Sequence, residues 1–594
     1  MLLNVTKVGA MAHQPSFKSS LFGDERYSDC TVTLRVRECG ADNYAKRLKT
    51  NAGSAALAPA DAGSSSSGAA ASPTADAGVQ EEDLPAHLFL ICGGSPFFVD
   101  LAEQALAEQA GGGASSGGGK LQLRVLLDTA EDLPYARAAL QYIYTGQLAA
   151  ATSRDVAALL HLWRIASHLQ IDGCIAACIA ALETRINGDA AAAVSPASPY
   201  SGIMELYSCR ALLPDPKSNP DAASLLAACR AELTTRVSAN GGIAAALRLD
   251  ALGEMLAWLF PDAPSVMSDW QMQRHALVLP PQLLDALLAS DAFATDDEAS
   301  VLLLVVKWLY ANKTATNMTA AVAGSVNSTW AEVLLHRVRL VQMHPMYLYD
   351  ILNQLFICAA EEVSWLPYIL SREEHVLLCQ FAADVTVNNS RRRRKLADTV
   401  AAAWGRYNCK SPWYNPVPRA LAWHDTGIPL EWYISQAVLR RELADQSNTI
   451  CLHATFRRPG FCLVAGGMIW NPALLFTKRP PFARLMLYSE LPEVLEAAGV
   501  EDATGVVGLA ARLTVHRRST TGAEVEPLSF VLQKDDYGFR KMSRIFELPL
   551  AQVGGGSDSD GDGGDTETGE GSLLAPWAAY LQSNLTISGT VTLL

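Results

Sequence analysis

The chain has 594 residues, a formal net charge of −14 and 49% hydrophobic residues. This length exceeds what one hydrophobic core supports, so we expect three or more domains. The acidic charge argues against binding nucleic acid by bulk electrostatics, and the absence of a run of about 18 apolar residues predicts no transmembrane helix. The twelve cysteines form no CxxC pair, which indicates free thiols in a reducing compartment, the cytosol or the nucleus.

The N-terminal part of the chain predicts strands and then helices. Residues 1–20 form a tail without the basic, apolar and small-residue order of a secretory signal, although the lack of acidic residues leaves an organelle transit peptide open. Alternation in SDCTVTLRV (28–36) predicts a half-buried strand. LPAHLFLICGGSPFFVDLAEQAL (84–106) predicts a strand and then a helix starting near Ser95-Pro96, because proline suits the first helical turn. LQLRVLLD (121–128) predicts another strand.

Helices are predicted after these strands. EDLPYARAALQYIYTGQL (131–148) has apolar residues at helical spacing, and Gly146 supplies the left-handed residue that closes the helix. VAALLHLWRIASHLQ and DGCIAACIAALE predict two more helices. Low-complexity stretches at 41–83 and 110–120 are predicted to be flexible insertions within this part of the chain.

Taken in this order, these pieces resemble a BTB/POZ domain over residues 21–185. The resemblance implies an α/β fold that forms homodimers through an apolar, self-complementary surface. It assigns structural roles to Asp29, His87 and Gly146. The chain departs from the family pattern at Leu88, where a lysine is usual, and at Gly94, where an arginine is usual. These departures affect the charged pocket near the dimer centre.

A helical segment is predicted over residues 186–385. LPPQLLDALLASDAFATDDEASVLLLVVKWLYAN pairs two amphipathic helices, and Thr295 with Glu298 predicts a capping box ahead of the second one. WAEVLLHRVRLVQMHPMYLYDIL adds helical turns split at Pro345. Together these segments resemble the all-α BACK domain that follows BTB in many adaptor proteins. A basic linker is predicted over 386–425.

Beyond the linker the pattern changes to short alternating strands, which favours an antiparallel β-sandwich over residues 426–594. The predicted strands are NTICLHATFR, FCLVAGGMIW, PFARLMLYSE, GLAARLTVHRRS, PLSFVLQ and LTISGTVTLL. This region is similar to the MATH/TRAF-like sandwich and to the C-terminal region of plant BTB-BACK proteins of the light-response type. The expected fold class is therefore multidomain α+β.

These resemblances imply a non-enzymatic adaptor of a cullin-three RING ubiquitin ligase. The BTB domain and the start of BACK would bind cullin-three, and the C-terminal domain would recruit a protein substrate. In BTB adaptors, a hydrophobic-x-Glu element in the helix predicted here at 98–108 helps dock the cullin. Its candidate residues are Leu101, Glu103, Leu106, Glu108, Tyr142 and Tyr144. The alternative is an ordinary amphipathic helix with core tyrosines.

A second function stays open: a cullin-independent BTB scaffold or transcriptional regulator in the nucleus. The cluster RRRRK reads equally well as a nuclear import signal or as part of a solvated linker. It comprises Arg391, Arg392, Arg393, Arg394 and Lys395. We therefore expect the nucleus, the cytoplasm or both, with no direct partner among nucleic acids or membranes.

Motifs for chemistry are weak. The sequence has no phosphate loop and no H-E-x-x-H. A zinc site at Cys174 and Cys178, with His161 and His168 upstream, is less favoured than a buried helical core. DSDGDGGDTETGE (558–570) misplaces the last calcium ligand by one residue and favours a solvated acidic loop. We expect no cofactor, no metal and no catalytic residues. A pocket gathering His453, His516 and a carboxylate would instead indicate a hydrolase.

Overall fold

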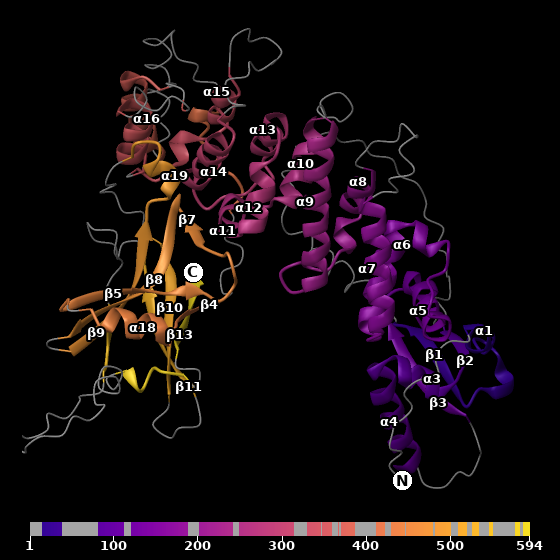
Figure 1. The fold of residues 1–594 in the computed structure, drawn as a ribbon. Helices are drawn as coiled ribbons and strands as arrows, with labels where there is room; N and C mark the ends of the chain where they lie inside the picture. Colours follow the sequence, from indigo (N-terminus) through magenta and orange to yellow (C-terminus); the bar gives the residue numbers. More distant parts are fainter. Residues whose placement is uncertain are drawn as a thin grey trace, which may run out of the picture. The chain divides into compact units, whose positions relative to one another are not determined.

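A computed structural model of the chain separates into two compact units, residues 1–232 and 233–594, and each is described on its own. Its elements are drawn in Figure 1. The structure describes residues 15–37, 81–111, 120–187, 201–240, 249–313, 329–345, 347–358, 366, 370–386, 411–421, 429–445, 447–478, 481–500, 509–518, 525–533, 546–550, 577–582 and 586–594. The segments at 391–395 and 558–570, to which an import signal and an acidic loop were assigned, lie outside these residues.

The first unit contains a three-stranded sheet in the order β2-β1-β3. β1 (Cys30–Val36) pairs antiparallel with β2 (Glu81–Ala86) and parallel with β3 (Leu121–Leu127). β3, which the sequence predicts as a strand, alternates buried and exposed residues along its whole length. β2 begins at Glu81, so residues 81–83 belong to a strand and the predicted insertion at 41–83 ends too late.

The first unit also contains helices, the earlier of which lie near this sheet while the later ones stack beyond them (Figure 1). They are α1 (Pro15–Ser20), α3 (Leu88–Gly94), α4 (Pro96–Gly111), α5 (Leu133–Thr145), α6 (Val156–His168), α7 (Asp172–Asn187), α8 (Ser201–Ser208) and the start of α9 (Pro220–Asn240). α4 begins at Pro96, as predicted, but continues through residues 110 and 111 of the second predicted insertion. Gly146 caps α5 with φ 65°, and its N–H donates to the Tyr142 carbonyl at 2.7 Å. This is the helix end that the sequence predicts.

The second unit begins with α-helices. They are the end of α9, α10 (Leu249–Leu259), α11 (Ala263–Ser268), α12 (Trp270–Leu277), α13 (Pro281–Ala289), α14 (Glu298–Ala311), α15 (Trp330–Leu335) and α16 (Arg372–Thr386). α14 is buried on almost every side, and the indole N–H of its Trp308 donates to the Leu279 carbonyl at 2.9 Å. After Pro345 the chain forms π-helical turns, Tyr347–Ile351 and Gln354–Cys358, rather than α-helix.

The predicted capping box of α14 is wrong. Asp297 is the N-cap, and its carboxylate accepts from the Ala299 N–H at 2.8 Å. The Thr295 hydroxyl donates to the Asp297 carbonyl at 2.7 Å, and Glu298 is used elsewhere. A capping box forms instead at α15, where Thr329 and Glu332 each bond the other's backbone.

Two antiparallel sheets complete the second unit, in the orders β11-β10-β13-β4-β6 and β12-β9-β8-β5, with β7 paired to β8. The first holds β4 (Leu430–Ile434), β6 (Thr455–Phe456), β10 (Ala511–Arg518), β11 (Val525–Leu532) and β13 (Ile587–Leu593). The second holds β5 (Thr449–His453), β7 (Leu463–Ala465), β8 (Met468–Lys478), β9 (Pro481–Glu490) and β12 (Phe546–Leu548). Helices α18 (Gln436–Leu443) and α19 (Glu493–Glu496) lie between strands in the sequence. All six predicted strand segments contain strands, whereas β4 and β12 were not predicted.

Aromatic side chains and one glycine fix the packing of these sheets. Phe530 of β11 stacks on Phe546 of β12, with ring centroids 4.6 Å apart, so the edge strands of the two sheets touch. A Cβ at Gly589 in β13 would lie 1.9 Å from the Thr514 carbonyl oxygen and 2.4 Å from the Trp432 ring. Only glycine fits at this point of the sheet without displacing backbone.

Residues 411–421, which the sequence assigns to the basic linker, are packed against the helices. Trp413 is 2% exposed, and its indole N–H donates to the Leu335 carbonyl at 2.9 Å. Its ring stacks on His336 with centroids 4.2 Å apart. The linker prediction is therefore wrong for this segment. Of the helices in the described ranges, none has the length and apolar content that a membrane crossing needs.

Candidate functional site

The α4 surface carries most of the residues predicted to dock a partner. Leu106 is 51% exposed, and Glu103 and Glu108 are exposed as well. Leu101 is only half-buried, and Ala102 between it and Glu103 is buried in the core. Glu103 and Leu106 are three residues apart and so share one helix face. The predicted hydrophobic and acidic side chains therefore reach solvent together, with Leu106 as the more accessible leucine.

Tyr144 does not belong to this surface. It is 3% exposed, and its hydroxyl accepts the His87 N–H at 2.9 Å. Burial raises the pKa of Tyr144 to about 12. Of the two interpretations of this tyrosine, the structure selects the core, because its ring also packs edge-on against Phe22. Tyr142, by contrast, is half-buried and its ring lies beside Gly173.

The three residues assigned structural roles lie around the start of α3. The Asp29 carboxylate accepts the Leu88 N–H at 2.7 Å, and His87 bonds Tyr144 through its backbone. Gly146 ends the helix that carries Tyr144. These contacts tie β1, α3 and α5 together.

A cavity of about 400 Å³ opens beside the first turn of α4. It is lined by the corner between α3 and α4 and by the corner before α7, including Asp100 and Asp172. Gly94 also lines it, and a Cβ at Gly94 would lie 2.7 Å from the Ile143 side chain. Any side chain at this position would have to displace Ile143, so glycine fits the packing between α3 and α5. The thiol of Cys92 in the lining is no activated nucleophile, because burial raises its pKa.

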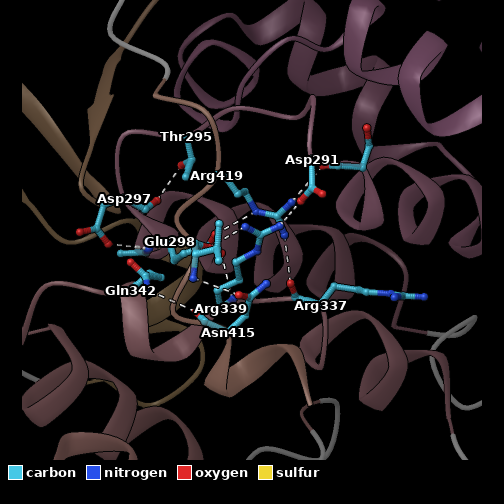
Figure 2. Close-up of polar contacts among 12 residues, drawn as sticks. Asp291, Thr295, Asp297, Glu298, Arg337, Arg339, Gln342, Asn415 and Arg419 are labelled. Atoms are coloured by element: carbon cyan, nitrogen blue, oxygen red, sulfur yellow. Dashed lines mark hydrogen bonds and ion pairs between the residues drawn. The ribbon is translucent and has the colours of Figure 1, made fainter. Parts of the chain in front are cut away.

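A second polar site, which the sequence analysis did not predict, lies at the N-terminus of α14 (Figure 2). Three consecutive acidic side chains each bind a different segment of the second unit. Asp296 accepts the Gly466 N–H at 2.5 Å, and Asp297 accepts the His344 N–H at 3.1 Å. Glu298 accepts the Arg419 Nε–H at 2.8 Å and the Arg339 N–H at 3.0 Å. This turn thus joins α14 to the β7–β8 turn, to the segment after α15 and to residues 411–421.

Three arginines lie near this turn: the side chains of Arg419 and Arg339 meet there, whereas that of Arg337 points away, as Figure 2 shows. The Arg419–Glu298 pair is 1% and 2% exposed at the side chains, and Arg419 also donates to the Ser290 and Arg337 carbonyls. Burial lowers the pKa of Arg419, and Glu298 opposes that shift. Arg337 makes a two-pronged ion pair with Asp285, at 2.6 and 3.0 Å. The buried charges of Arg419 and Glu298 need partners, because a buried charge without a partner is costly.

Arg339 is the third arginine, and its guanidinium is 7% exposed. It donates to the Val417 carbonyl at 2.7 Å and to the Asp291 carboxylate at 2.5 Å. Asp291 is itself 90% exposed. The only local signals for this cluster were the alternating Arg337 and Arg339 and the acidic triplet before α14.

The residues considered for chemistry do not converge. His453 lies in β5 and His516 in β10, which belong to different sheets. His516 bonds the Ser588 hydroxyl at 3.1 Å, and burial lowers its pKa.

The residues of the less favoured zinc site are equally separate. Cys174 and Cys178 are buried in α7, whereas His168 is exposed and His161 stacks on Tyr135. Within the described ranges, no three His, Cys, Asp or Glu side chains are grouped for a metal ion. Comparison with known protein families and with curated proteins finds no match.

Proposed function

We propose that the chain is a non-enzymatic substrate adaptor of a cullin-three RING ubiquitin ligase. The observation that carries the proposal is the exposed set of Leu106, Glu103 and Glu108 on α4. An apolar side chain that enters a partner pocket, flanked by carboxylates that meet a basic rim, is typical of a protein docking surface.

The element order of the first unit supports a BTB/POZ assignment. Two strands, two helices, a third strand and three helices follow one another there, as the resemblance implies. The helices α10 to α16 support a BACK-like segment, and the two antiparallel sheets support a MATH/TRAF-like sandwich. The turn at Asp296, Asp297 and Glu298 connects these helices to the sheets, so a substrate bound by the sheets would be held firmly against the helical segment.

A homodimer is the second part of the proposal. Tyr27 and Phe89 in the first unit are 71% and 73% exposed, which offers apolar area for a self-complementary interface. Two substrate sites in one dimer would raise avidity without new contacts. Besides cullin-three and a second copy of the chain, the proposed partner is a protein substrate, which the sequence does not identify.

The proposal is tested by size-exclusion chromatography with light scattering on the full chain, alone and mixed with the N-terminal domain of cullin-three. We expect a dimer that carries two cullin domains. Leu106→Arg should abolish co-elution and leave the dimer mass unchanged. A well-folded chain that does not bind the cullin domain at high micromolar concentration would contradict the adaptor function.

A cullin-independent nuclear scaffold or transcriptional regulator is the alternative. The basic run Arg391–Lys395 supports nuclear entry, and Leu88 and Gly94 alter the surface typical of the BTB family. Fluorescent fusions with and without this run replaced by glutamines would test localisation in the nucleus, the cytoplasm or both. Nuclear accumulation that depends on the run, combined with no cullin binding, would favour this alternative.

A further inference from the structure

A cavity of about 410 Å³ lies beside the arginine cluster of the second unit. Its lining includes Arg337, Arg339, Arg419 and Asp291, together with Ser411 and Asn415 from the packed segment 411–421. We name it the arginine pocket. Its size falls within the range of about 300–1,000 Å³ that is typical of ligand sites.

The buried charges at this pocket are not balanced among themselves. Of the carboxylates that bond the two buried guanidiniums of Arg339 and Arg419, only that of Glu298 is itself buried. The remaining countercharge is Asp291, which bonds Arg339 at 2.5 Å but is 90% exposed. A solvated carboxylate holds its partner weakly, because water screens the pair and the side chain gains freedom on leaving. A ligand carboxylate can therefore compete for the same guanidinium.

The rest of the lining indicates what kind of anion fits. Leu288, Pro412 and Pro416 contribute apolar wall beside the arginines. The volume far exceeds that of one small ion, given that a water molecule occupies about 30 Å³. An acidic group attached to a chain uses both the guanidiniums and the apolar wall, whereas free phosphate uses only the former.

We propose that the arginine pocket binds an acidic side chain of a partner polypeptide, whose carboxylate takes the place of Asp291 beside Arg339. Arginine suits this role because its planar donors match a carboxylate. The site lies within the second unit and does not depend on cullin binding. Since the whole chain carries a net charge of −14, bulk electrostatics oppose an acidic ligand, and binding of one would report a local site.

The test uses the full chain and a fluorescein-labelled hexaglutamate peptide, with hexaglutamine as the uncharged probe, followed by fluorescence anisotropy. Asp291→Asn removes the competing carboxylate and should lower the Kd for hexaglutamate about two- to fivefold, the worth of an exposed ion pair. Glu496→Gln, an exposed residue of α19 outside the pocket lining, removes the same charge and should leave the Kd unchanged. Arg337→Gln should weaken binding.

The proposal would be overturned if hexaglutamate did not bind, or if Asp291→Asn and Glu496→Gln had equal effects on its Kd. It would also be overturned if equimolar inorganic phosphate displaced the peptide, because that result would assign the pocket to a free anion. If Arg337→Gln fails to fold, Asp291→Asn still decides the question, because that side chain is exposed.

Discussion

Replacing Glu298 by glutamine tests whether the buried ion pair holds the second unit together. The change keeps the shape of the side chain but removes the charge that faces Arg419 at 2.8 Å. Both side chains are at most 2% exposed, so Arg419 would remain buried without its carboxylate. Breaking a buried pair in this way costs about 3–5 kcal/mol. Urea unfolding of the full chain, followed by tryptophan fluorescence, should show this loss.

The matched control is Glu431→Gln in the same unit. Glu431 pairs with Arg457 at 3.2 Å, but the side chains are 55% and 54% exposed. An exposed pair contributes about 0.2–1 kcal/mol, so this variant should unfold almost like the original chain. If Glu298→Gln loses no more stability than Glu431→Gln, the buried pair does not have the role assigned to it. A double variant, Glu298→Gln with Arg419→Met, should recover part of the lost unfolding free energy, because no buried charge is then left without its partner.

Three further predictions follow from single residues. Gly589→Ala should abolish the unfolding transition of the second unit in a thermal scan, because the added Cβ would lie 1.9 Å from the Thr514 carbonyl oxygen. Gly93→Ala is the control and should be tolerated, because its added Cβ would have no atom within 4 Å. Equal melting of the two variants would contradict the packing described. Burial raises the pKa of Asp297 from 3.8 to about 7, so its stabilising contribution is present at low pH and is lost as the pH rises from about 4 to about 7. The urea midpoint of the original chain should therefore fall more across that interval than the midpoint of Asp297→Asn, and parallel curves would refute this. Tyr144→Phe removes the acceptor of the His87 N–H and should cost about 1–3 kcal/mol, whereas an unchanged urea midpoint for the first unit would show that this bond is unimportant.

Local patterns in the sequence predicted local structure well. Alternation at residues 28–36 located β1, Pro96 marked the start of α4, and Gly146 marked the end of α5. The pattern S/T-x-x-E failed at Thr295, because the neighbouring Asp297 is itself a good cap and Glu298 is needed by Arg419. Short strands such as β12, with three residues, carry too few positions for a period to appear.

The arginine pocket could not have been predicted from local patterns. Glu298 bonds Arg339 across 41 residues and Arg419 across 121 residues. No spacing rule connects such positions, and only the folded chain brings them together. For Leu106, the sequence predicted the helix that carries it. The sequence did not predict which face of that helix packs on the core, and therefore did not predict how far Leu106 is exposed. Tyr144 belonged to the same set by sequence, and its burial became evident only from its bond to His87.

Isothermal titration of the full chain with the N-terminal domain of cullin-three tests the central claim most directly. The adaptor function predicts one cullin domain per protomer with a Kd in the micromolar range or tighter, and a loss of at least about tenfold, or about 1.4 kcal/mol, for Leu106→Arg. Val531→Arg, a comparably exposed apolar residue at 46% in β11, should bind like the original chain. The absence of binding heat for the folded original chain, or equal binding by Leu106→Arg, would contradict the proposed docking surface.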